Sequence, residues 1–172
     1  MKGQLLLRQQ VSEMDGFSKV LVTGGAGFIG SHLIDGLMSR GFCVRVVDNL
    51  SNGNIRNLES WLDDPRFEFV RGDLKNPKVA LRSVDDVGMV FHLAANSEVR
   101  MGETGPSVLF DENLLVTFNL LEAMRKSEKA KLMVFASSSL FTVSRIGFRL
   151  LKVMCFFCRF LFMGRLNLGV NR

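Results

Sequence analysis

The chain has 172 residues, 47% of them hydrophobic, which is typical of a single globular domain with a buried core. Its net charge of +5 is uneven, because residues 1–128 carry 14 Lys and Arg against 17 Asp and Glu, whereas residues 129–172 carry eight basic residues and no acidic one. The larger part is therefore not basic, and we expect no nucleic-acid partner. Three cysteines make no disulfide framework and no secretory signal is visible, so we expect a cytoplasmic protein.

Strand and helix patterns alternate after residues 1–17, which we expect to be a loose leader. In chain order the patterns predict a strand at 19–23, a helix at 28–40, a strand at 43–47, a short helix at 58–62, a strand at 67–71, a helix at 77–83, a strand at 88–93, a helix at 107–126 and a strand at 131–136. This alternation predicts a Rossmann-type α/β fold. Right-handed crossovers restrict the topology to doubly wound orders. We expect a parallel sheet of five strands in the order 3-2-1-4-5.

A glycine-rich turn separates the first predicted strand from the first helix. Gly24, Gly27 and Gly30 follow a G-x-x-G-x-x-G pattern there. In a dinucleotide-binding turn the first glycine permits the tight bend, the second lets the backbone approach a pyrophosphate, and the third lets the helix pack against the strand. The amino end of the helix then presents free N–H groups to the phosphates. The context between a strand and a helix makes this pattern specific.

An acidic residue, Asp48, ends the second predicted strand, 18 residues after Gly30. A carboxylate at this place accepts hydrogen bonds from ribose hydroxyls and repels a 2′-phosphate. The sequence therefore favours NAD over NADP. Arg45 lies within the strand and is a poor candidate for binding a 2′-phosphate.

Six segments resemble the extended short-chain dehydrogenase/reductase family, and within it the nucleotide-sugar epimerases and dehydratases, of which the UDP-glucose 4-epimerases are the most similar. The segments are TGGAGFIGSHL at 23–33, VDNLSNG at 47–53, GDL at 72–74, FHLAA at 91–95, NLLVT at 113–117 and ASSS at 136–139. They occur in the order and spacing of the family. The resemblance implies that residues 18–139 form the first part of an NAD-binding Rossmann domain.

The resemblance also implies a role for each matching residue. The pyrophosphate would be held by Gly24, Gly27, Phe28, Ile29 and Gly30, the adenosine ribose by Asp48, Asn49 and Asn52, and the adenine by Asp73 and Leu74. The path beyond the fourth strand would be lined by Leu93, Ala94 and Ala95, supported by Asn113. Ser137 would lie close to the nicotinamide, and Ser138 matches the active-site Ser/Thr that hydrogen-bonds the sugar hydroxyl. His32 and His92 are interpreted as structural, and no metal site is expected.

Catalysis in the resembled family depends on a Tyr and a Lys four residues apart, and this chain contains no Tyr. Lys152 is the only lysine after Lys131, and Phe148 stands four residues before it. We therefore expect an NAD-binding fragment that is catalytically inactive, with the sheet truncated after the fifth strand and no C-terminal substrate domain. A nucleotide sugar would be a ligand of the intact parent.

Residues 140–172 form a basic, Phe-rich tail with no Asp or Glu, and the family match stops before it. Out-of-frame translation is the favoured explanation. The alternatives are an amphipathic membrane-surface helix and a segment for self-association or partner binding. The corresponding alternative functions are a tail-anchored membrane-surface protein and an inactive regulator that pairs with a full-length relative.

Overall fold

The computed structural model describes residues 19–96 and 106–136. A five-stranded parallel sheet is formed by β1 (Lys19–Thr23), β2 (Cys43–Asp48), β3 (Phe67–Arg71), β4 (Met89–His92) and β5 (Leu132–Phe135). The strand order is β3-β2-β1-β4-β5, and all four pairings are parallel. The predicted fold class and strand order are confirmed.

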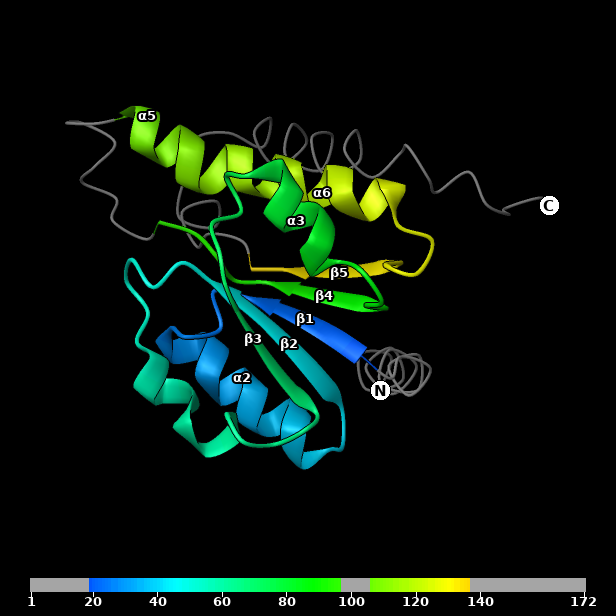
Figure 1. The fold of residues 1–172 in the computed structure, drawn as a ribbon. Helices are drawn as coiled ribbons and strands as arrows, with labels where there is room; N and C mark the ends of the chain where they lie inside the picture. The colour runs from blue at the N-terminus through cyan, green and yellow to red at the C-terminus, as the bar shows by residue number, and fades with distance from the viewer. Residues whose placement is uncertain (1–18, 97–105, 137–172) are drawn as a thin grey trace, which may run out of the picture. The chain divides into compact units, whose positions relative to one another are not determined.

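Helices cover both faces of the sheet (Figure 1). One face carries α2 (Phe28–Ser39) and the 3-10 helix η1 (Ile55–Trp61). The other carries α3 (Pro77–Ser83) and a long helix built from α5 (Pro106–Leu109), the π-helical turn η2 (Phe110–Leu115) and α6 (Val116–Lys126). The strands read as nearly continuous apolar runs because both faces are buried.

Each strand divides its side chains between two hydrophobic cores. In β1, Val20 and Val22 pack with Ile34 of α2, whereas Leu21 packs on the opposite face with Leu120 of α6. This alternation follows from the two-residue period of a strand. The two cores fix β1 at the centre of the sheet, between β2 and β4.

Two elements differ in helix type from the sequence-based expectation, and several others differ by one residue at an end. The short helix expected at 58–62 is a 3-10 helix that begins earlier, at Ile55, because the Asn54 side chain accepts a hydrogen bond from the Arg56 N–H and caps it. The helix expected at 107–126 contains the π-helical turn η2. A π-helical turn inserts one residue into an α-helix, which changes the direction of the side chains before it.

None of the helices in the two described ranges is both long enough and apolar enough to cross a membrane. The described residues from Lys19 to Phe135 belong to one compact unit. The expected leader at 1–17 and the tail at 140–172 lie outside the described residues.

Candidate cofactor site

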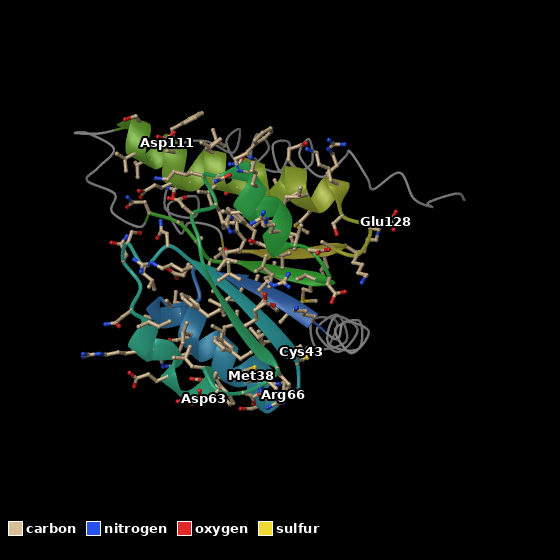
Figure 2. All side chains as sticks on the ribbon, viewed as in Figure 1. Met38, Cys43, Asp63, Arg66, Asp111 and Glu128 are labelled. Carbon is tan, nitrogen blue, oxygen red and sulfur yellow. The ribbon has the colours of Figure 1, made fainter. Side chains whose placement is uncertain are left out.

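The loops that carry the predicted site residues all follow the carboxyl ends of strands. Parallel strands place these ends at one edge of the sheet, where ligands of doubly wound folds bind. Figure 1 shows the loops after β1, β2, β3 and β4 meeting at this edge, next to the start of α2. Met38, Cys43 and Arg66 gather at the other edge (Figure 2), where Arg66 donates to the Met38 carbonyl at 3.4 Å. Cys43 is thus remote from the candidate site.

The turn between β1 and α2 requires glycine at two of the predicted positions. Gly24 has a φ of +69°, and a Cβ there would lie 2.8 Å from the backbone nitrogen of Ala94. At Gly30 a Cβ would lie 2.4 Å from the Gly24 carbonyl oxygen. The backbones of the turn, of α2 and of the loop after β4 therefore approach one another more closely than any side chain permits.

The amino end of α2 is open to an external anion. Its N-cap residue, Gly27, provides no side-chain cap for the first turn. The next two residues, Phe28 and Ile29, are 78% and 69% exposed although both are large and apolar. The uncapped N–H groups and the helix dipole give this end a partial positive charge that suits a phosphate.

Asp48 stands beside this turn at the end of β2, with only 8% of its surface exposed. One carboxylate oxygen accepts from the Ala26 N–H at 2.9 Å, and the other accepts from the Leu50 N–H at 2.8 Å. The carboxylate thus ties the glycine turn to the loop after β2. Each oxygen has a second lone pair, which leaves it able to accept a hydrogen bond from a ribose hydroxyl.

The loop after β2 contributes two further predicted residues. Asn49 is exposed, and its amide nitrogen lies 3.5 Å from a carboxylate oxygen of Asp73 in the loop after β3. Asn52 is exposed on the same loop. The structure therefore brings Asp48, Asn49 and Asp73 together, as expected for residues that would surround one adenosine. Arg45 lies elsewhere, bonded to Glu68 and to carbonyl oxygens at the end of α3.

The loop after β3 is hydrogen-bonded to a side chain of α6. Leu74 is 4% exposed and its side chain packs in the core with α3 and α6, so only its backbone faces the edge of the sheet. The buried Asn119 side chain donates to the Leu74 and Lys75 carbonyls at 3.0 and 2.9 Å. The sequence analysis did not identify Asn119. The sequence could have indicated it, because Asn119 is a polar residue on the apolar face of a predicted helix.

The loop after β4 is fixed from both sides. The N–H groups of Leu93 and Ala94 both donate to the Thr23 hydroxyl, each at 3.2 Å. Further along, the Asn113 side-chain oxygen accepts from the Asn96 N–H at 2.6 Å, and the Asn113 amide nitrogen lies 3.3 Å from the Asn96 carbonyl. Asn113 belongs to η2, so the π-helical turn faces this loop. Ala95 is exposed between the two anchors.

A buried histidine connects the same elements. His92 lies 2.7 Å from the Thr23 hydroxyl through Nδ1 and 2.9 Å from the Thr117 hydroxyl through Nε2. The Thr117 hydroxyl donates its own proton to the Asn113 carbonyl at 2.6 Å, so it must accept from His92 Nε2–H. In the neutral imidazole Nδ1 then accepts from Thr23. Burial lowers the pKa of His92 from 6.5 to about 4, in agreement with this neutral form.

Two predicted residues, Ser137 and Ser138, lie outside the described residues. In the described part of the chain no group of three or more His, Cys, Asp or Glu residues is arranged to hold a metal ion. The described residues thus place the uncapped amino end of α2, the Asp48 carboxylate and the loops after β2, β3 and β4 at one edge of the sheet.

Known proteins similar to this chain include a nucleotide-sugar epimerase and a decarboxylase. The model of a family described as GDP-mannose 4,6 dehydratase matches residues 21–141. A bifunctional UDP-glucose 4-epimerase and UDP-xylose 4-epimerase of Pisum sativum is 38% identical over 70% of this chain and 37% of its own length. UDP-glucuronic acid decarboxylase 1 of Danio rerio is 34% identical over 72% of this chain and 28% of its own.

A solved structure from Thermus thermophilus, a UDP-glucose 4-epimerase in complex with NAD, is 40% identical with a TM-score of 0.59. It covers 66% of this chain and 36% of its own. The chain thus spans between 28% and 37% of the length of these relatives. They include both epimerases and a decarboxylase, so the likeness extends across more than one reaction.

Proposed function

We propose that this chain, which belongs to the nucleotide-sugar epimerase and dehydratase family of short-chain dehydrogenases/reductases, binds NAD at the carboxyl edge of its sheet. The observation that carries the proposal is the uncapped amino end of α2, which lies against the glycine turn and next to the Asp48 carboxylate. A helix end suits a pyrophosphate, and a carboxylate suits ribose hydroxyls. Residues 18–139 are the proposed NAD-binding domain.

The proposed ligand contacts follow the placement of the residues. The turn from Gly24 to Gly30 would receive the pyrophosphate, with Phe28 and Ile29 presenting backbone N–H groups. Asp48, Asn49 and Asn52 would bind the adenosine ribose, and the backbone of Asp73 and Leu74 would lie along the adenine. The loop of Leu93, Ala94 and Ala95, anchored by Asn113, would border the path towards the nicotinamide.

The same carboxylate supports NAD over NADP. Asp48 already accepts from two N–H groups and is nearly buried. A 2′-phosphate next to it would bring like charges together at a site that water screens poorly. Arg45 is not free to compensate for this charge, because it bonds Glu68 and the end of α3.

We further propose that the 172-residue chain binds the cofactor without completing the family's reaction. NAD, when bound, supplies a hydride acceptor. Hydride removal from a sugar carbon also needs a base within hydrogen-bond reach of the sugar hydroxyl. Ser138 would hold that hydroxyl, but the 172 residues contain no Tyr to take its proton.

A thermal unfolding scan with and without ligand tests the proposal. NAD at 100 times its dissociation constant should stabilise the folded chain by about 2.7 kcal/mol. We expect a clear rise in Tm with NAD and a smaller one with NADP. Absence of any NAD-dependent shift from a chain that unfolds cooperatively would refute NAD binding.

A matched pair of variants tests the role of Asp48. Asp48→Asn removes the charge and replaces one of the two accepting oxygens with an NH2 group, so the affinity for NAD should fall and the preference for NAD over NADP should narrow. Asp63→Asn makes the same chemical change at an exposed residue near Met38 and Arg66 (Figure 2) and should leave both affinities unchanged. Equal NAD and NADP affinities in the unmodified chain would contradict the assignment.

A further inference from the structure

A buried amide on α6 is bonded to the loop after β3. Asn119 is 8% exposed, and its side-chain nitrogen donates to the carbonyl oxygens of Leu74 and Lys75. A buried amide without partners would be costly, so these two bonds explain why a polar residue is tolerated on the apolar face of the helix. Both acceptors belong to the same short loop, more than 40 residues away in sequence.

The other tertiary hydrogen bond to the backbone of this loop lies at its start, while its middle is anchored by the buried Leu74 side chain. At its start the Gly72 N–H donates to the Asp48 carbonyl at 3.1 Å. At its far end the Asn76 side chain caps α3 by accepting from the Lys78 N–H. Between these points the Asp73 side chain accepts from within the loop, at Lys75 N–H. The Asn119 amide is the buried tertiary donor that reaches the backbone in the middle of the loop.

The position of this middle part relative to Asp48 matters for a ligand. Asp73 and the Leu74 backbone face the same edge of the sheet as the Asp48 carboxylate, and Asn49 reaches Asp73 across the gap between the two loops. A shift of the Leu74 and Lys75 carbonyls would therefore change the distance between the ribose-facing carboxylate and the loop that would border the base. Ordering such a loop before a ligand arrives removes an entropic cost of binding.

We propose that Asn119 is a positioning residue for the adenosine end of the cofactor site. Its amide holds the Leu74 and Lys75 carbonyls so that the loop after β3 keeps a fixed distance from Asp48 and borders the adenine. Asn119 itself does not touch the ligand, because its side chain is buried and is bonded to the backbone of the loop. The inference rests on the proposed binding of NAD.

The test compares three variants of the 172-residue chain with the unmodified protein, using NAD and ADP as probes. Asn119→Leu keeps a similar volume but removes both donors. Asn119→Gln keeps an amide on a longer side chain. Met124→Ala is the control, because Met124 is a buried apolar residue of the same helix and the same core. Dissociation constants are measured at a temperature at which every variant is folded by circular dichroism.

We expect Asn119→Leu to raise the dissociation constants of NAD and ADP by the same factor, on the order of tenfold, the size of one lost net hydrogen bond. Asn119→Gln should recover part of this loss. Met124→Ala should lower Tm at least as much and yet leave both constants within about twofold. If Asn119→Leu shows no cooperative unfolding, Asn119→Ala takes its place in the comparison.

The outcomes separate the two proposals. Binding of NAD and ADP by the unmodified chain with unchanged constants in Asn119→Leu would overturn the positioning role alone. An equal loss of affinity in Met124→Ala would also overturn it, because the effect would then follow stability rather than the loop. Failure of the unmodified chain to bind either probe would overturn the proposed function and the positioning role together.

Discussion

Substitution of Gly30 by alanine tests the close approach of α2 to the glycine turn. A Cβ at residue 30 would lie 2.4 Å from the Gly24 carbonyl oxygen and 2.6 Å from the Gly25 Cα. Both neighbours are backbone atoms of the turn, so neither can rotate away. Overpacking of this kind costs about 1 to 3 kcal/mol, and the helix propensity of alanine offsets at most about 1 kcal/mol. Together these effects should lower the free energy of unfolding by up to about 2 kcal/mol, and Gly30→Ala should be clearly less stable than Gly36→Ala.

The same helix offers a matched control. A Cβ at Gly36 would meet only the guanidinium of Arg40, at 3.2 Å, and that side chain is long and exposed. Gly36→Ala should therefore stabilise the protein by about 0.5 to 1 kcal/mol through helix propensity alone. Urea unfolding of both variants gives the two free energies, and NAD titration gives the affinities. We expect Gly30→Ala to weaken NAD binding because α2 must move away from the turn.

The result that refutes this reasoning is a Gly30→Ala variant as stable as Gly36→Ala with unchanged NAD affinity. It would mean that the turn and the helix are not in backbone contact. A loss of stability in Gly30→Ala without any loss of NAD affinity would confirm the packing but contradict the proposed place of the pyrophosphate.

Two further predictions concern stability. Burial lowers the pKa of His92 to about 4, so between pH 6.5 and 4 the unfolded chain binds more protons than the folded chain, and stability falls as the pH falls through this window. The histidine should account for a loss of about 3 kcal/mol in the free energy of unfolding between pH 7 and pH 4. Urea unfolding of the unmodified chain and of His92→Gln measures this loss as the difference between their pH dependences. Equal pH dependences would contradict the neutral, buried imidazole. Arg45→Met should cost about 1 to 3 kcal/mol, because the guanidinium bonds Glu68 and the carbonyls of Arg82 and Ser83 at the end of α3. Arg56→Met changes an exposed residue and should alter the free energy of unfolding by less than about 0.5 kcal/mol. Similar losses in the two variants would argue against the contact between Arg45 and the end of α3.

Much of the fold follows from the sequence because the relevant interactions are local or regular. The bounds expected for the strand at 19–23, the strand at 67–71 and the helix at 77–83 are those of β1, β3 and α3. The first two are short apolar runs ended by turn residues, and the third starts at a proline in a position that favours helix initiation. The handedness of parallel crossovers restricted the sheet to doubly wound orders, a rule that holds for almost any sequence of this pattern.

The glycine turn and Asp48 could likewise be identified from the sequence, because their spacing is set by one strand, one turn and one helix that are continuous in the chain. The sequence also determined the absence of a tyrosine. The sequence did not determine where η1 starts or where the long helix contains its π-helical turn. The start of η1 depends on the Asn54 cap, and the π-helical turn at Phe110–Leu115 depends on where Asn113 meets the loop after β4.

Only the tertiary structure decided which polar side chains hold the loops. His92 bonds Thr23 and Thr117, and Asn119 bonds Leu74 and Lys75, across separations of 25 to 69 residues. Nothing in the local pattern around these residues indicates a partner, since hydrogen bonds between distant segments form only when the sheet order and the packing of α6 have brought them together. The sequence by itself therefore determined the elements and the glycine-rich turn, whereas long-range packing decided how the loops around that turn are held.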